Sequence, residues 1–103
     1  MRVAIPVWQS RVSPVFDTAG HLLIVDVEDG REVHRAEASI LGLSLPDRVN
    51  RLVEFDVDVL LCGAISRQLA GMAAASRLIH LDRVPNNSLD KIGLATWSFI
   101  PAA

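Results

Sequence analysis

The sequence predicts a single α/β domain in which helices pack on a mixed, largely parallel β-sheet. Two observations lead to this class. Runs rich in β-branched residues alternate with segments whose apolar residues recur at helical spacing, and strand–helix–strand units require parallel pairing. An Asp29-Gly30 turn between two of the runs adds an antiparallel hairpin. The 103 residues, half of them apolar, suit one globular unit over residues 1–103.

The first part of the chain predicts three strands. Arg2 to Val7 is a short β-rich run, and Val12 to Asp17 is a loop because it contains a Ser-Pro step that disfavours helix. His21 to Val27 is almost entirely apolar, which is typical of a strand buried on both faces. Glu32 to Ala38 returns from the hairpin as an edge strand, because its charges suit an exposed ladder.

The second part alternates helices and strands. Pro46 and Asp47 follow Ser44, a pattern typical of a capped helix N-terminus, and that helix should end near Phe55. The elements expected after it are a strand over Asp56–Cys62, a helix with its N-cap at Ser66, and a strand over Leu78–Leu81. From Leu89 onward the spacing fits a helix or a strand, and we expect a short helix or a loosely packed segment.

Charge and composition exclude several classes of protein. The net charge of -2 gives no electrostatic reason to expect nucleic acid or an acidic membrane as a partner. No apolar stretch approaches the roughly 20 residues of a membrane span. A single cysteine, Cys62, excludes an internal disulfide framework and fits a reducing compartment, so we expect a cytoplasmic protein. A domain this small gains stability from a protein partner or from a homodimer.

The turn Cys62-Gly63-Ala64-Ile65-Ser66 is the first candidate site. It lies at the carboxyl end of a predicted parallel strand and at the start of a helix, where open α/β sheets bind ligands. The free amides of a first helical turn attract anions, and glycine allows a close approach to the backbone. Cys62 is a candidate ligand for a soft metal. The alternative is that Cys62 is a small buried side chain.

The loop after the first strand is the second candidate. It should lie at the same end of the sheet, where Arg11 is able to pair with an anion and Ser13 lies near Gly63. The alternative is an ordinary surface loop with Phe16 in the core. We therefore expect two distant segments to meet and form an electropositive pocket of main-chain N–H groups.

Other chemistry has weaker support in the sequence. The three histidines, of which we expect His34 to face solvent and His21 and His80 to be partly buried, lack the spacing of zinc motifs. Asp56 and Asp58 share one face of a predicted strand, but at the end opposite to the usual site. No nucleophile elbow, Walker loop or dinucleotide fingerprint is present, which favours a binding protein over an enzyme.

Four segments, in order and spacing, resemble the dinitrogenase iron–molybdenum cofactor biosynthesis family, a family of small nitrogenase accessory proteins. They are Arg2 to Val7, Val12 to Ala19, Leu23 to Gly30 and Val57 to Ile65, and the resemblance covers about residues 2 to 80. It implies a ribonuclease H-like, three-layer α/β/α fold with a five-stranded mixed sheet. It also implies a protein without catalytic activity that carries an anionic iron–sulfur or molybdenum-containing cluster or its precursor.

The chain departs from the family's pattern in the first loop. The family's Ser-Pro-His-Phe-Gly aligns with residues 13–17, so Val15 replaces the histidine and Asp17 replaces the glycine. The glycine turn is retained, and Cys62 is the residue that would partly replace the lost ligand. The resemblance thus implies a cluster-binding site formed by Arg11, Ser13, Cys62, Gly63, Ala64, Ile65 and Ser66, with Cys62 as the metal ligand.

Two rival functions remain open from the sequence. The missing loop histidine motivates a structural or regulatory interaction domain that has lost the cluster site. A ribonuclease H-type enzyme would need carboxylates gathered around two metal ions. Asp26, Asp56 and Asp58 are not expected at one end of the sheet, so we predict no such activity.

Overall fold

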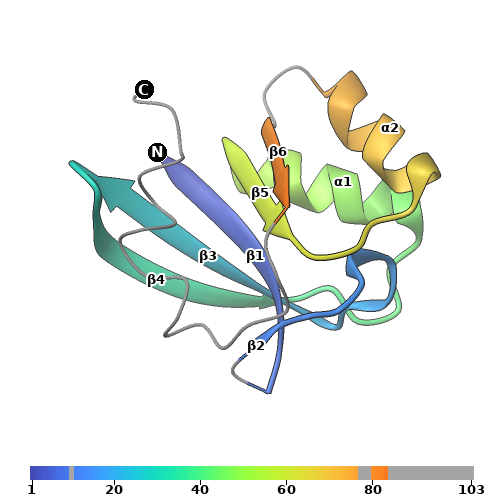
Figure 1. Ribbon diagram of the computed structural model, residues 1–103, viewed down its shortest axis with the longest axis horizontal. Helices are drawn as coiled ribbons and strands as arrows, with labels where there is room; N and C mark the ends of the chain where they lie inside the picture. The colour runs from blue at the N-terminus through green and yellow to red at the C-terminus, as the bar shows by residue number, and fades with distance from the viewer. Residues whose placement is uncertain (10, 77–79, 84–103) are drawn as a thin grey trace.

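One mixed β-sheet organises the molecule (Figure 1). The computed structural model describes residues 1–9, 11–76 and 80–83. Their elements are β1 (Arg2–Trp8), β2 (Arg11–Val12), the 3-10 turn η1 (Phe16–Thr18), β3 (His21–Glu28), β4 (Arg31–Ser39), α1 (Leu45–Glu54), β5 (Val59–Cys62), α2 (Arg67–Ala75) and β6 (His80–Arg83). The strands lie in the order β4-β3-β1-β5-β6, and the short β2 pairs with β1.

The pairing directions correct one expectation. β1 is antiparallel to β2 and β3, and β3 is antiparallel to β4. Parallel pairing joins β1 to β5 and β5 to β6. The prediction of a mixed sheet with five main strands is confirmed, but "largely parallel" is wrong. The reason is that the β3–β4 hairpin adds to β1 antiparallel, and β2 folds back on the same strand.

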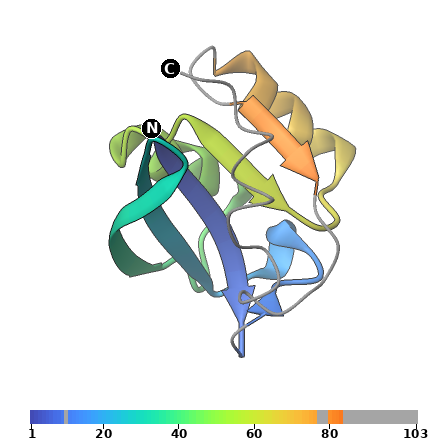
Figure 2. The ribbon, with the colours of Figure 1, turned by 60° about the vertical axis from the view of Figure 1, so that its left-hand side comes forward.

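Both α1 and α2 pack on one face of the sheet (Figures 1 and 2). The chain moves in one direction from β1 to β5 to β6, and right-handed crossovers in one direction place their helices on the same face. The core between helices and sheet includes the fully buried Phe16, Leu52, Leu60 and Leu69. This layer fixes the positions of the loops that follow β1 and β5.

The opposite face of the sheet carries a second apolar cluster. Its buried members all come from strands: Val3, Ile5, Val7, Val12, Leu23, Val25, Val27, Val59 and Leu61. Within residues 1–9, 11–76 and 80–83, no helix packs on this face. Two layers are therefore described, and the three-layer, ribonuclease H-like arrangement is not established by them. The segment expected from Leu89 onward lies outside the described residues.

Local chemistry determines the best-predicted boundaries. Asp29 and Gly30 have φ values of 52° and 74°, as a two-residue hairpin turn requires, so the Asp-Gly prediction is confirmed. Ser44 caps α1 by accepting a hydrogen bond from the Asp47 amide at 3.3 Å, and Phe55 is the C-cap. Strand β4 is the edge strand that its charges indicated.

Pro6 explains why the first loop contains a strand that was not predicted. β1 pairs with β5 only at Val3 and Ala4, so Pro6 lies beyond this pairing, where its missing N–H is not needed. Its carbonyl instead accepts a 2.8 Å hydrogen bond from the Ser13 amide. The chain thereby folds back along β1 as β2, where we had expected a plain loop.

Two strand boundaries differ from those expected. β5 begins at Val59, later than the predicted Asp56, because Asp56 has a φ of 54° that extended backbone does not allow. The last strand is His80–Arg83, whereas the sequence predicted Leu78–Leu81, and residues 77–79 lie outside the described part. Among the described helices, none has the length and apolar character needed to cross a membrane.

Candidate functional site

The loops that follow β1 and β5 meet at the end of the sheet where these two strands have their carboxyl ends (Figures 1 and 2). A parallel bridge joins Val15 to Ala64. The Phe16 amide donates to the Ala64 carbonyl at 2.9 Å, and the Ala64 amide donates to the Pro14 carbonyl at 2.9 Å. The expected meeting of these two segments is confirmed, because β1 and β5 are parallel neighbours whose carboxyl ends share an edge.

Gly63 is explained by this meeting. A Cβ atom at residue 63 would lie 3.1 Å from the Pro14 carbonyl oxygen and 3.3 Å from that of Ser13. Both contacts are with backbone, which has little freedom to move. The absence of a side chain at Gly63 thus lets the first loop pack against the turn. The group that comes close to the Gly63 backbone is this loop.

Ser13 lies inside this contact. Ser13 is 5% exposed, and its hydroxyl donates to the Val15 carbonyl at 3.4 Å. Its amide is bonded to the Pro6 carbonyl. The hydroxyl therefore helps to hold the loop turned toward Ala64.

The carboxylate of Asp17, a residue of η1, lies at the N-terminus of α2. Its Oδ1 accepts a 2.9 Å hydrogen bond from the Ser66 amide, and the Ser66 hydroxyl accepts one from the Leu69 amide at 3.1 Å. A carboxylate at this end of a helix compensates the partial positive charge of the helix dipole. Two of the amides expected to face an anion, those of Ala64 and Ser66, thus already donate to the chain's own oxygens.

Arg48 of α1 fixes the other side of the first loop. It is 4% exposed, and its Nη1 donates to the carbonyls of Ala19 at 2.6 Å and Phe16 at 3.3 Å. Its Nε donates to the Leu43 carbonyl at 3.1 Å. Burial lowers the pKa of the Arg48 guanidinium, and the negative charge of Asp17 acts in the opposite direction. The loop is therefore held from α1 and from α2.

The remaining predicted site residues are placed differently. Arg11 is exposed and lies opposite Trp8 in the short β1–β2 pairing, whereas Cys62 is fully buried in the core cluster under the helices. Ile65 is also buried. The described residues contain no group of three or more histidine, cysteine, aspartate or glutamate side chains that could hold a metal ion.

Sequence reasoning missed the roles of Asp17 and Arg48. Asp17 was noted only as the residue that replaces the family's glycine, although a carboxylate is able to compensate the dipole at a helix N-terminus. Arg48 lies four residues before Leu52 on the apolar face of α1, so its burial had a signal in the helical spacing. His34 is exposed as expected, but His21 is also exposed, which corrects its assignment as partly buried.

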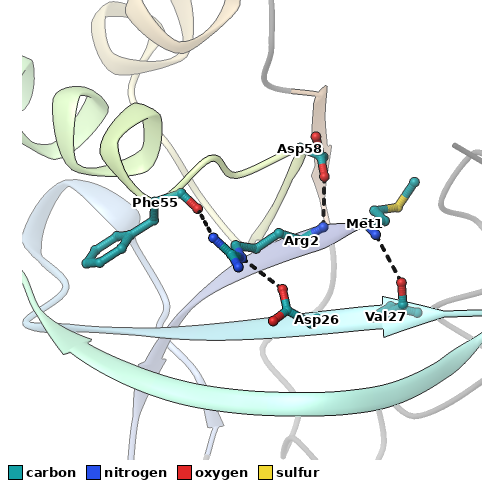
Figure 3. A network of polar contacts seen from close by, with 6 residues as sticks. All are labelled: Met1, Arg2, Asp26, Val27, Phe55 and Asp58. Atoms are coloured by element: carbon teal, nitrogen blue, oxygen red, sulfur yellow. Dashed lines mark hydrogen bonds and ion pairs between the residues drawn. The ribbon is translucent and has the colours of Figure 1, made fainter.

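A second polar cluster surrounds Arg2 at the other edge of the sheet (Figure 3). The Arg2 guanidinium donates to Asp26 at 2.8 Å and to the Phe55 carbonyl at 2.7 Å, while its amide donates to Asp58 at 2.8 Å. The hydrogen bond with Asp26 raises the pKa of Arg2, and the same bond lowers the pKa of Asp26. Asp56 adds a further negative charge near Arg2.

This cluster corrects the expected separation of the carboxylates. Asp26 and Asp58 do lie at one edge of the sheet, but both are bonded to Arg2, one through its side chain and one through its amide. A hollow of about 260 Å³ adjoins Arg2 and Asp26 and is also lined by His34, Ala36 and Phe55. The arrangement ties the start of β1 to β3 and to the end of α1.

A larger hollow of about 630 Å³ lies on the strand-only face. Trp8, which is 56% exposed, borders it together with His21, Leu23 and Arg35. Strand β4 thus has a hollow on each face of the sheet, since Ala36 and Glu37 contribute to both.

Comparison with known proteins identifies the fold. No family model matches the chain, and no curated protein does. Among solved structures, PH0822 has a TM-score of 0.85 at 20% identity, covering 96% of this chain and 90% of that one. A protein described as a candidate dinitrogenase (MJ0327) from Methanocaldococcus jannaschii has a TM-score of 0.73 at 20% identity, covering 96% and 89%.

A third solved structure is that of a candidate NifB protein from Thermotoga (TM1290), described as a member of the DUF35 family. Its TM-score is 0.61 at 24% identity, and the match covers 96% of this chain and 88% of that one. At these identities the likeness shows a shared α/β fold. The class that fold and loops define is therefore a small α/β domain with two loops joined at the carboxyl ends of parallel strands.

Proposed function

We propose that this chain is a binding protein of the nitrogenase accessory kind, without catalytic activity, whose cargo is an anionic iron–sulfur or molybdenum-containing cluster or its precursor. The names given to MJ0327 and TM1290 support a nitrogenase-related role. The four sequence segments that resemble the accessory family support the same role. The single structural observation that carries the proposal is the Val15–Ala64 bridge, which joins the two segments from which the cargo site is proposed.

The proposed site is the edge formed by these loops. Arg11 contributes positive charge and Ser13 a hydroxyl. Cys62, which is fully buried behind the Gly63–Ser66 turn, is the proposed metal ligand that the cargo reaches when the loops open. One thiolate does not hold a cluster alone, since clusters usually have about four protein ligands. The cargo is therefore retained mainly through its negative charge and its sulfur atoms, which suits a protein that passes it on.

Asp17 sets a condition on this proposal. Its carboxylate already lies where an anion would meet the Ser66 amide, 2.9 Å away. Two negative groups do not share one donor without a large repulsive cost in a partly buried site. We therefore propose that the cargo displaces the Asp17 carboxylate, which acts as a replaceable internal anion.

The same hydrogen bond favours a second candidate function. If Asp17 is never displaced, the loops are permanently closed, and the chain is a structural or regulatory interaction domain that has lost the cluster site. Both candidates predict the same apo fold. They differ in what removal of the Asp17 charge does to cluster binding.

Anaerobic reconstitution separates the two. Wild type, Asp17→Asn and Cys62→Ala are incubated with ferrous iron and sulfide, and separately with tetrathiomolybdate, and absorption spectra are recorded. The carrier proposal expects charge-transfer bands in wild type, at least a threefold stronger affinity in Asp17→Asn, and weaker bands in Cys62→Ala. Asp47→Asn, which removes a carboxylate from the first turn of α1, is the matched control and should behave as wild type.

Absence of bands in all four proteins would remove the carrier function and leave the interaction domain. Circular dichroism establishes that each variant is folded before it is scored. A nuclease assay with magnesium tests the non-catalytic part of the proposal, and turnover there would overturn it.

A further inference from the structure

Strand β4 lies at one edge of the sheet, and among the described residues no strand pairs with its outer side. β4 is the last strand in the order, and eight of its nine residues, all but Ala38, are exposed. An unpaired strand edge is a template for another chain. What matters is which backbone groups of this edge point outward and whether its side chains favour a particular partner.

Hydrogen bonds at the strand ends determine the outward groups. The Ile40 amide donates to the Gly20 carbonyl at 2.8 Å, so even-numbered residues of β4 bond to β3 in this register. Met1 and Val27 exchange hydrogen bonds of 2.8 and 3.1 Å, so the odd-numbered residues of β3 form their backbone hydrogen bonds with β1. The even-numbered residues of β3 are therefore the ones that bond to β4, which agrees with the first observation. The N–H and C=O groups of Arg35 and Glu37 therefore point away from the sheet.

A β-bulge limits the regular part of this edge. The register shifts between Asp26 and Val27, so Val33 is the extra residue on β4. The shift brings Glu32 to the face of Arg35, and the two form an ion pair of 2.6 Å. Residues 34–39 keep a regular register, and Ala36 lies near the middle of this segment.

We propose that this edge binds a second copy of the chain, with the two β4 strands antiparallel and Ala36 on the twofold axis. In this register Arg35 lies opposite the partner's Glu37, and the pairing occurs twice by symmetry. The outward backbone groups of Arg35 and Glu37 form the hydrogen-bonded pairs. Opposite charges in directly opposed positions stabilise a strand pair.

Other registers lose this charge complementarity. A twofold axis at Val33, Arg35 or Glu37 opposes like charges: Arg31 with Arg35, Arg35 with itself, or Glu37 with itself. An axis at His34 pairs Arg31 with Glu37, but Arg31 lies beyond the bulge, where the edge is irregular. The axis at Ala36 is thus the register in which the regular segment is complementary to itself.

Side-chain size favours the same register. Ala36 and Ala38 lie on the helix-bearing face and border the hollow of about 260 Å³. The pair at the twofold axis is non-hydrogen-bonded, in which side chains approach most closely, and alanine fits there without a clash. The partner's His34 lies across from Ala38, beside this hollow. Because few residues pair, we expect a reversible, concentration-dependent dimer.

A charge-reversal cycle followed by sedimentation velocity tests the register. At low salt the wild type should dimerise with rising concentration, and Arg35→Glu or Glu37→Arg alone should weaken the dimer at least tenfold. The double variant Arg35→Glu/Glu37→Arg should recover to within about threefold of wild type. A wild type that stays monomeric to about 1 mM, or a double variant as weak as either single one, would overturn the proposal.

Disulfide trapping tests the axis without altering charge. In Ala36→Cys the two thiols meet in a pair whose Cα atoms are about 4.5 Å apart, within the range of a disulfide. In the control Ala38→Cys, four residues of offset separate the two thiols by about 13 Å. Oxidation should give a covalent dimer only in Ala36→Cys. The wild type is oxidised in parallel and shows whether the buried Cys62 forms any cross-link by itself. Equal cross-linking of both variants, cross-linking of neither, or capture of an unrelated peptide instead of a second copy contradicts the arrangement.

Discussion

Replacing Arg48 with methionine should destabilise the protein by about 3 kcal/mol. The change leaves the carbonyls of Phe16 and Ala19, both in buried residues, without their guanidinium donor. Leaving the buried Ala19 carbonyl unpaired costs about 1–3 kcal/mol. The Phe16 carbonyl keeps the Ala19 amide as a donor at 3.2 Å, so loss of its bond to Arg48 adds about 0.5–1.5 kcal/mol. The Leu43 carbonyl is in a partly exposed residue, where water is able to replace the donor. Methionine fills much of the volume, so the cost of a cavity stays small.

Urea unfolding at neutral pH, followed by circular dichroism, measures this loss. With a slope of about 1.5–2 kcal/mol per molar urea, the midpoint should fall by about 1.5–2 M. Arg51→Met is the matched control on the same helix. Its ion pair with Glu54 is 3.7 Å long and exposed, so its loss should change the free energy of unfolding by less than about 0.5 kcal/mol. Equal losses in the two variants would refute the role assigned to Arg48.

Two further changes test other contacts. Gly63→Ala should cost about 1–2 kcal/mol because its Cβ meets the Pro14 carbonyl at 3.1 Å, whereas Gly71→Ala, with nothing within 4 Å, should stabilise α2 by about 0.5–1 kcal/mol; urea midpoints that move in the same direction would contradict this. Asp26→Asn should lower stability at pH 7 by less than about 1 kcal/mol, since its ion pair with Arg2 is partly exposed. Because folding lowers the pKa of Asp26, this difference should begin to vanish near the unfolded-state pKa of about 3.9 and be gone below the folded-state pKa; a difference independent of pH between 2 and 7 would exclude the ion pair as its source.

Features decided by neighbouring residues were predictable from the sequence. The Asp29-Gly30 turn and the caps at Ser44 and Ser66 lie where local backbone and hydroxyl chemistry placed them. The meeting of the two loops was also predictable, because it follows from strand direction alone. Two parallel neighbours have their carboxyl ends at the same end of the sheet, whatever side chains the loops carry.

Features decided by distant residues were not predictable in the same way. The bond between Asp17 and the Ser66 amide joins residues 49 positions apart, and the bond from Arg48 to Phe16 spans 32. Neither pairing leaves a periodic trace in the sequence. Strand β2 likewise depends on an open edge of β1 beyond Pro6, which appears only once β5 is known to end its pairing at Ala4.

The candidate site shows the same limit. The position of the site followed from the strand order. The sequence did not show which oxygen atoms accept hydrogen bonds from the backbone N–H groups of the site. Asp17, which the sequence showed only as a replacement for the family's glycine, supplies that oxygen for Ser66. A negative charge near an anion site is therefore ambiguous until its hydrogen-bond partner is known.

The central position of β1 has a consequence for biosynthesis. β1 is translated before the other described strands, yet Arg2 bonds to Asp58, which precedes β5 and lies 56 residues later in the chain. The β3–β4 hairpin is able to cover one edge of β1 early, whereas the other edge waits for Val59 and Leu60. A nascent chain interrupted before β5 thus keeps an apolar strand with one unpaired edge, and such intermediates are prone to aggregate unless chaperones bind them.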